Sequence, residues 1–381
     1  MRKGCVQPGI AADALRAQLN AALGTDMSHI TILVGAGATV SDAMNRSIKH
    51  RPPLDRGFFR AASSAKTSGL APVREYMASQ YGIDPTKGEH DSLESVMATL
   101  YSDIYNPSLA QNQAGESFRA LLRVLVRRLA STTNSLEPSP QSNLYRILRK
   151  LLRGGVRPEN ITIITFNQDL QIERTLHAIQ SAKVWSDLRV FEFPHCYRLP
   201  DVPVTTPTAG DAPVFPVSEL LTDGVEVLKL HGSLNWFSRH TSREPSPRSL
   251  LNPRRALTIT TRSTVRAELT TKGKRVVYMY PVVVPPVVHK AAILHEHLAP
   301  VWQRAQEALA FTNHLIAFGY SCPPSDHESA NLLRSALRNS QDLKTVSVID
   351  PSPITLQRYV ELTSFDRIYF YRSAKAYLEG A

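Results

Sequence analysis

Three polar side chains that could take part in catalysis directly follow short apolar runs of the sequence. Asn167 and Asp169 come after the run 161–166, and His231 comes after the run 225–230. A histidine titrates near neutral pH and can act as a general base. An amide and a carboxylate two residues apart can hold ribose hydroxyls or a water molecule. These three residues therefore form a candidate catalytic set.

Two members of this set also have an ordinary structural interpretation. Because Asn and Asp are preferred at helix N-termini, Asp169 is equally suited to cap the helix predicted from Leu170 to Ile179. A lone histidine is more often structural than catalytic. His231, however, directly precedes Gly232, which allows a ligand to approach closely. The residues alone leave both interpretations open.

A glycine-containing loop, Gly35-Ala36-Gly37-Ala38-Thr39, follows another apolar run at 30–34. Such a loop permits a tight turn and lets backbone N–H groups approach a pyrophosphate, whose charge the following helix N-terminus favours. The complete dinucleotide-binding fingerprint would have a third glycine where this chain has Val40. A tight turn that binds no ligand is therefore the alternative interpretation of this loop.

Two further apolar runs end on residues suited to a sugar or a phosphate. Gly319 and Ser321 follow the run 314–318, and Asp350 follows the run 346–349. The first pair could hold a phosphate or a ribose, and Asp350 could accept a hydrogen bond from a ribose hydroxyl. Taken singly, each signal is weak.

The apolar runs and the helical segments between them predict how these residues are positioned. The five runs are rich in β-branched residues and alternate with helical periodicity, which is typical of an α/β, doubly wound, Rossmann-like parallel sheet. In such sheets ligands bind beyond the carboxyl ends of the strands. We expect helices at 93–100, 118–129, 144–152, 301–311 and 326–337.

The predicted organisation is one main domain with two insertions. An N-terminal helical segment, with a helix at 11–23, occupies residues 1–28, and the main domain occupies 29–381. A helical insertion is expected at about 60–155 and a basic loop or hairpin insertion at about 238–275. In the second insertion the hairpin would pair Ala256–Thr261 with Thr264–Leu269.

Most of the net charge of +11 comes from the basic insertion. Residues 238–275 contain ten Lys or Arg and two acids, Glu244 and Glu268, which gives +8. The ordinary interpretation of such a run is a solvated insertion. The functional alternative is a surface for an acidic partner or a nucleic acid.

The cysteine content and the length of the apolar runs bear on the cellular compartment and on whether the protein binds a metal or a membrane. Cys5, Cys196 and Cys322 are odd in number and far apart, which argues against a disulfide scaffold or a four-cysteine zinc site. No run reaches the roughly 20 apolar residues of a membrane span, and no secretory signal is evident. The expectation is a cytoplasmic protein without a metal or a membrane anchor.

In their order along the chain, these motifs together resemble those of the sirtuin family. A sirtuin-type chain has a G-A-G-x-S loop, T-x-N-x-D, a catalytic H-G, G-x-S, and a late strand ending in Asn or Asp. Here the motifs read Gly35-Ala36-Gly37-Ala38-Thr39, Thr165-Phe166-Asn167-Gln168-Asp169, His231-Gly232, Gly319-Tyr320-Ser321 and Val348-Ile349-Asp350. The resemblance extends over residues 30–350, nearly the whole chain.

The resemblance implies that NAD is the substrate and gives each matching residue a role. Catalysis would fall to Asn167, which holds water and ribose hydroxyls, to His231 as general base, and to Asp169, which orients nicotinamide or supports Asn167. The residues implied to contact the rest of NAD are Gly35, Ala36, Gly37, Thr39, Phe166, Gly319, Ser321 and Asp350. Thr39 replaces the usual serine and keeps its hydroxyl.

One departure from the family pattern changes the expected reaction. Sirtuin deacylases carry two C-x-x-C pairs after the catalytic histidine, whereas residues 238–275 contain no cysteine. Together with Pro285-Pro286 and Lys290, the motifs look like the sirtuin-like branch of bacterial anti-phage systems, whose members hydrolyse NAD. Softer matches to that branch lie at 53–59 and 92–94.

The expected function is therefore an NAD+ glycohydrolase that depletes NAD when a gate opens. The resemblance further implies a complex with a motor ATPase or an Argonaute-like protein. A homo-oligomer is also expected, because long helices such as 118–129 offer apolar faces. The alternatives are an NAD-dependent protein deacylase, a non-catalytic NAD or ADP-ribose sensor, and, from the basic insertion alone, a nucleic-acid-binding protein.

Overall fold

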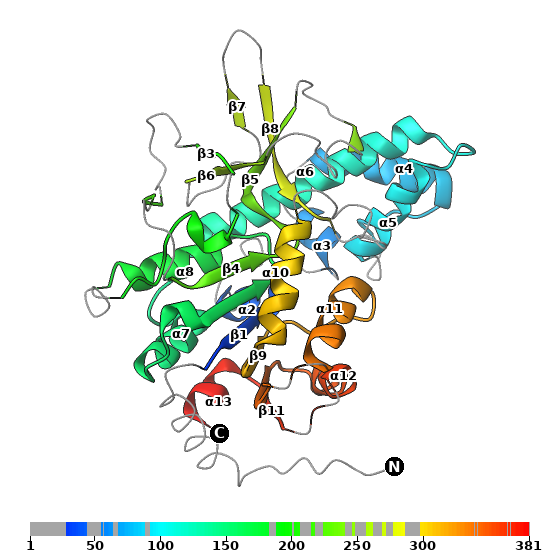
Figure 1. Ribbon diagram of the computed structural model, residues 1–381. Coiled ribbons are helices and arrows are strands. Elements are labelled where there is room, and N and C mark those ends of the chain that lie inside the picture. The colour runs from blue at the N-terminus through cyan, green and yellow to red at the C-terminus, as the bar shows by residue number, and fades with distance from the viewer. Residues whose placement is uncertain are drawn as a thin grey trace, which may run out of the picture.

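A six-stranded parallel sheet forms the centre of the computed structural model (Figure 1). Its strand order is β11-β10-β9-β1-β2-β4. The strands are β1 (Ile30–Val34), β2 (Ile161–Thr165), β4 (Glu226–Lys229), β9 (His314–Phe318), β10 (Thr345–Ile349) and β11 (Ile368–Tyr371). The α/β, doubly wound parallel sheet and its five predicted strands are confirmed. The edge strand β11 was not predicted.

The structure describes most of the chain. The described residues are 28–43, 55, 57–63, 68–87, 92–182, 188–199, 202–205, 215–217, 224–240, 246–247, 257–261, 269–271, 277–285, 298–338, 340, 342–363, 365 and 367–380. The helix predicted at 11–23 and most of the basic insertion lie outside these residues.

The strand order reverses between β1 and β9. From β1 the chain builds the sheet outward through β2 to β4, then returns to place β9 on the other side of β1. At such a switch point the loops that leave two neighbouring strands turn to opposite faces, and a crevice opens between them. Here these loops begin at Gly35 and Gly319.

Helices cover both faces of the sheet. On one side α10 (Ala299–Ala310), α11 (His327–Arg338) and α12 (Pro353–Thr363) pack in sequence, and α10 crosses in front of the sheet in Figure 1. The helix α2 (Ala36–Ala43) lies behind β1. The helix α7 (Asn143–Arg153) packs against α8 (Gln171–Gln180) and α13 (Ala374–Glu379).

The predicted helical insertion contains two structural parts. Its last helix, α7, packs against α2, α8 and α13 and so belongs to the layer that covers the sheet. The projecting part contains α3 (Phe58–Ser63), α4 (Ala71–Tyr81), α5 (Leu93–Asp103) and the 25-residue α6 (Gln111–Ser135). Since α4 and α5 both pack on α6, the long helix is the central element of this part.

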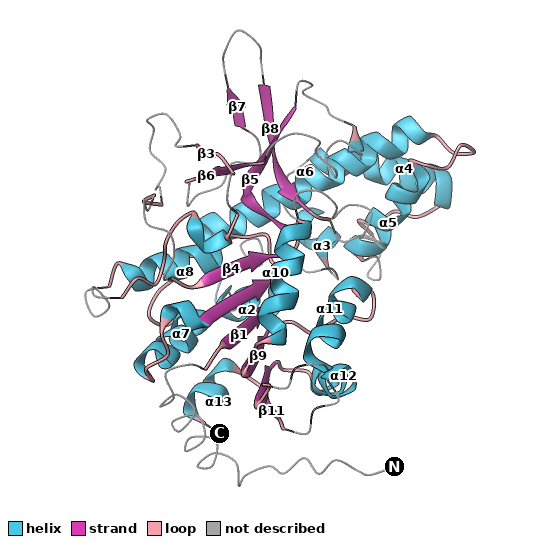
Figure 2. Cartoon of the chain, viewed as in Figure 1, coloured by secondary structure: helices cyan, strands magenta, loops and turns pink. Residues whose placement is uncertain are grey.

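A second, mainly antiparallel sheet lies next to the parallel sheet in Figure 2. Its strand β5 begins shortly after β4 along the chain. Its order is β3-β6-β5-β8-β7, with β3 (Val204–Thr205), β5 (Gly232–His240), β6 (Thr258–Thr260), β7 (Leu269–Thr271) and β8 (Val277–Val283). The predicted hairpin of 256–261 with 264–269 is wrong. The strand β6 pairs with β5 and β3, whereas β7 pairs with β8.

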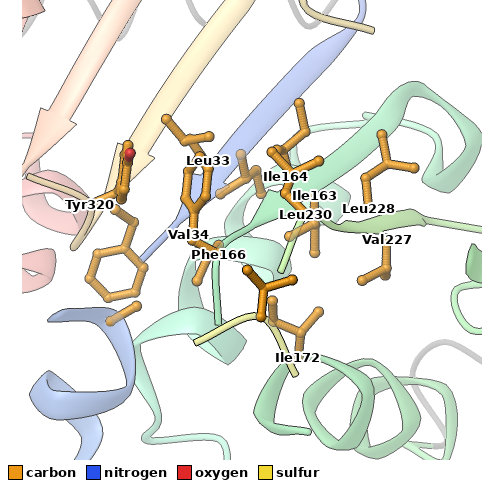
Figure 3. Close-up of a cluster of buried hydrophobic side chains, with 14 of the residues drawn as sticks. Leu33, Val34, Ile163, Ile164, Phe166, Ile172, Val227, Leu228, Leu230 and Tyr320 are labelled. Carbon is orange, nitrogen blue, oxygen red and sulfur yellow. The ribbon is translucent and has the colours of Figure 1, made fainter. Parts of the chain in front are cut away.

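The parallel strands form the hydrophobic core. Every residue of β1, β2, β9 and β10 is buried, as expected for strands covered on both faces. Figure 3 shows side chains of β1, β2 and β4 packed together with Phe166 and Tyr320. This apolar packing fixes the carboxyl ends of the strands, where the polar residues lie. None of the helices in the described part of the chain is long and apolar enough to cross a bilayer.

His314, the first residue of β9, should make the fold sensitive to acid. Its ring is 5% exposed, its Nδ1 lies 2.8 Å from Thr345 Oγ1, and burial lowers its pKa to about 4. Because the unfolded state takes up a proton near pH 6.5 and the folded state does not, stability is full above that pH. It falls by at most about 1.4 kcal/mol per unit as the pH drops towards 4. Urea unfolding at pH 7.5 and pH 5 should show a smaller difference for His314→Gln than for the wild type. An unchanged difference would contradict this account.

Candidate functional site

A cavity of about 490 Å³ opens at the carboxyl ends of the parallel strands, at the switch point. Most of the predicted site residues line it, namely Ala36, Gly37, Phe166, Asn167, Asp169, His231, Gly319, Ser321 and Asp350. Gly35 and Thr39 are not among its lining residues. The structure thus brings together residues that lie far apart in the sequence.

Two glycine turns pack backbone against backbone at one wall of the cavity. Gly37 N donates to Gly319 O at 2.9 Å, and Gly35 N donates to Phe318 O at 3.0 Å. A Cβ atom on Gly35 would lie 2.4 Å from Gly319 O. Gly319 has a φ of 64°, and its Cβ would lie 2.1 Å from Ala38 N. These positions require glycine because of this contact, so Gly35 shapes the wall without lining the cavity.

Asn167, Thr39 and Asp169 form a chain of hydrogen bonds beside this wall. Asn167 Nδ2 donates to Gly35 O at 3.0 Å and to Thr39 Oγ1 at 3.3 Å. Thr39 Oγ1 in turn donates to Asp169 Oδ2 at 3.1 Å. The Thr39 hydroxyl therefore connects two of the predicted catalytic residues and fixes how they face the cavity.

Asp169 lies just before the helix α8, whose N-cap residue is Leu170, and its side chain contacts both the start of the helix and the cavity. Its Oδ1 accepts from the backbone N–H of Gln171, the first residue of α8, at 3.1 Å, while the residue also lines the cavity. Burial raises the pKa of Asp169, and the nearby Lys229 opposes that rise. The helix-start contact and the position in the site are thus compatible.

Replacing Thr39 with valine should remove the hydrogen bonds that link Asn167 and Asp169, while keeping a branched side chain of similar size. We expect kcat for nicotinamide release, the activity proposed below, to fall about tenfold, because Asn167 and Asp169 each lose a hydrogen-bond partner. Thr39→Ser keeps the hydroxyl and should retain near wild-type turnover. Steady-state kinetics and thermal unfolding of both variants check this. Equal turnover in the two variants would contradict a role for the hydroxyl.

His231 lies at the junction between the two sheets. It follows β4 and Leu230 and directly precedes β5, where Gly232 has a φ of 77°. The ring is 7% exposed and packs edge-on against Phe166, with 5.4 Å between ring centroids. The ring centroid of Trp302 lies 6.3 Å from that of His231, and Trp302 Nε1 donates to Leu230 O at 2.9 Å. Aromatic rings thus hold the imidazole at the edge of the cavity.

A buried polar network packs behind the Asp169 segment and away from the cavity. Lys229 Nζ donates to Glu173 Oε1 at 2.9 Å, and both side chains are 0% exposed. Lys229 also donates to the backbone O of Asp169. Glu173 accepts from Tyr197 Oη at 2.8 Å, and Asn235 Nδ2 donates to the same hydroxyl at 3.0 Å. The network links the Asp169 segment to β4 and β5 on either side of His231.

The first cavity is strongly acidic. Besides Asp169, it is lined by the carboxylate residues Asp55, Glu94, Asp326 and Asp350, and no Lys or Arg is among its described lining residues. Two of these acids also connect separate segments of the chain. Ser325 Oγ donates to Glu94 Oε2 at 2.9 Å, and Glu94 N donates to Asp55 Oδ1 at 2.8 Å. Across the described residues, no group of His, Cys, Asp and Glu is arranged to hold a metal ion.

Sequence reasoning missed several residues that line or support this cavity. Tyr320 stacks on Phe166 with ring centroids 4.0 Å apart and donates to Asp326 Oδ2 at 3.0 Å. Gln168 lines the cavity and donates from Nε2 to Val284 O at 2.9 Å. Tyr320 and Gln168 lie inside motifs that were noted, so proximity to those motifs was the available signal. Asp326 and Trp302 had no local signal.

A second cavity of about 500 Å³ adjoins the first at the switch point. The two share Gly37, Gly319 and Asp350 as lining residues. The second one is also lined by Arg372 and Lys375, so its charge is opposite to that of the first. The two cavities thus lie next to each other and differ in the charge of the residues that line them.

The chain matches no family model and no curated protein. Among solved structures it is similar to a mutant Sir2 homologue in complex with ADP-ribose, with 16% sequence identity, coverage of 95% of this chain and 93% of that chain, and a TM-score of 0.41. It is also similar to a complex of Sir2 with a p53 peptide and NAD+, with 11% identity, coverage of 97% and 96%, and a TM-score of 0.39. The functional assignment therefore depends on the site residues themselves.

Proposed function

We propose that the chain is an NAD+ glycohydrolase, which cleaves the nicotinamide–ribose bond to give nicotinamide and ADP-ribose. The observation that carries the proposal is the convergence of Asn167, Asp169 and His231 on one acidic cavity at the switch point. The order of the motifs along the chain, which resembles that of sirtuins, supports the same substrate.

The charge of the two cavities fits the charge distribution of NAD+. The nicotinamide ring is a cationic pyridinium, and the ribose becomes oxocarbenium-like as the ring leaves. Both positive charges are favoured where Asp55, Glu94 and Asp326 line the wall. The adenosine end of the dinucleotide then lies towards the second cavity, which Arg372 and Lys375 line. An uncharged ligand would not be favoured by the opposite charges of the two cavities.

In this mechanism His231, Asn167 and Asp169 act on the attacking water. The C1′–N bond breaks, and its electron pair goes to the nicotinamide nitrogen. A water oxygen bonds to C1′, and His231 takes the proton that this water loses. Because both hydrogen bonds from the Asn167 amide use Nδ2, its Oδ1 is the atom that accepts from the water or a ribose hydroxyl. Asp169 positions Asn167 through Thr39.

The rest of NAD+ would contact the glycine wall. Ala36 and Gly37 line the first cavity at the start of α2, where backbone N–H groups and the helix N-terminus favour a pyrophosphate. Phe166, Gly319 and Ser321 line the same cavity. Asp350 lines both cavities and is placed to accept from the adenosine ribose between them.

The deciding experiment is the release of nicotinamide from NAD+ by the purified full chain. Release in water alone, with ADP-ribose as the second product, supports the proposal. Release that requires an acylated peptide would assign a deacylase instead. Binding of NAD+ without release, under every activating condition tried, would assign a sensor. The assay is repeated with the product of the neighbouring gene, because gating by a partner and an anti-phage role remain predictions.

A further inference from the structure

We propose that the second cavity accepts a phosphate on the adenosine 2′-hydroxyl, so that NADP+ is a substrate alongside NAD+. The inference rests on the proposed function and concerns which dinucleotide the same site takes. It is argued from Asp350 and Arg372 at the carboxyl ends of β10 and β11, which do not act in cleavage of the nicotinamide–ribose bond.

The two edge strands place an acid and a base side by side. Asp350 follows β10 and Arg372 follows β11, and the pairing of Ile349 with Tyr371 puts these two strand ends in register. Asp350 N donates to Tyr371 O at 3.0 Å, which continues the pairing beyond β10. Both Asp350 and Arg372 line the second cavity. A ribose held by Asp350 therefore has Arg372 as a close neighbour.

The identity of these residues determines the preferred group at the 2′ position. In dinucleotide sites an acid at a strand end accepts from a free 2′-hydroxyl, whereas a nearby arginine accommodates a 2′-phosphate. Asp350 alone would reject the phosphate. Its Oδ1 is already engaged by the backbone N–H of Ser352 at 2.8 Å, however, which spreads part of its charge.

The local charge favours the phosphate. A phosphate monoester carries about −1.5 to −2 at neutral pH. Arg372 and Lys375 face it with two positive charges against one negative charge on Asp350. Lys375 also contacts Glu379 at 3.9 Å, but both side chains are well exposed, so this pair is weak and Lys375 can turn to a ligand. A cavity of about 500 Å³ is within the usual size of small-ligand sites.

The first test compares kcat/KM for NADP+ and NAD+. We expect the wild type to cleave both within about tenfold, and Arg372→Ala/Lys375→Ala to lower the NADP+ to NAD+ ratio about tenfold or more. Arg367→Ala and Lys344→Ala are the matched controls, since these exposed residues precede β11 and β10 at the opposite ends of the strands. Cleavage of NAD+ alone by the wild type would overturn the inference. An equal loss for both dinucleotides would also overturn it, because the cations would then serve the pyrophosphate.

The second test does not depend on turnover. Calorimetry compares ADP-ribose with 2′-phospho-ADP-ribose on the wild type and on Arg372→Ala/Lys375→Ala. Tighter binding of the 2′-phosphorylated ligand, lost in the double variant, supports the inference even if neither dinucleotide is cleaved. Equal or weaker binding overturns it. Failure of the proposed function, which is absence of nicotinamide release, is thereby distinguished from failure of this inference.

Discussion

Replacing His231 with alanine is expected to lower kcat for nicotinamide release by about 10²–10⁴-fold, the usual contribution of a positioned general base. The imidazole packs near Phe166 and Trp302 and lines the acidic cavity, and no other described histidine lines it. The KM for NAD+ should change much less than kcat, because the residue acts on the water and not on the bound cofactor. Steady-state kinetics of the purified variant measure both constants.

The control for this variant separates loss of chemistry from loss of fold. His195 also carries an imidazole but is not among the residues that line the cavity, so His195→Ala should retain near wild-type turnover. Thermal unfolding should show that His231→Ala still folds. A similar loss of kcat is expected for Asn167→Ala. Undiminished nicotinamide release by a folded His231→Ala protein would remove His231 from the mechanism.

Replacing Lys229 with methionine is expected to destabilise the protein by about 3–5 kcal/mol. The variant leaves the carboxylate of Glu173 in a site with 0% exposure and without its cation. The hydroxyl of Tyr197 still donates to Glu173, but a single hydrogen bond from an uncharged donor does not supply the positive charge that the lysine provided. The free energy of unfolding in urea at neutral pH measures the loss.

Two further variants test the cause of this destabilisation. Lys87 forms an exposed ion pair with Asp84 at 3.8 Å, so Lys87→Met should change the free energy of unfolding by less than about 1 kcal/mol. Lys229→Met/Glu173→Leu removes both buried charges and should recover part of the stability that Lys229→Met loses. A double variant less stable than Lys229→Met would show that the cost comes from lost packing and not from the unpaired carboxylate.

The sequence was sufficient to predict the parallel sheet because its strands carry a local signal. Five short runs of mostly apolar residues, each followed by a polar residue or glycine, occur where the structure has buried strands. The carboxyl ends of parallel strands meet at one edge of the sheet, so the gathering of Asn167, His231 and Asp350 followed from the fold class. The edge strand β11 was missed because three of its four residues are only partly buried, unlike those of the inner strands.

The antiparallel sheet and the support of the site could not be predicted in the same way. The strand β5 pairs with β8 across a long stretch of the chain, with an irregular register between Ser233 and Phe237, and no local pattern specifies such a partner. The stacking of Phe166 on Tyr320 depends on two segments that only the completed sheet brings together. The role of Lys229 was hidden because a lysine at the end of a strand is usually exposed.

The position of β9 beside β1 has a consequence for synthesis of the protein. The glycine turn at Gly35 is translated well before its packing partner Gly319 and the acid Asp350. A nascent chain that ends before His314 has Asn167 and His231 but lacks one wall of the cavity. Such a fragment lacks Gly319, Ser321 and Asp350, so the cavity is complete only after this whole domain has been made and folded.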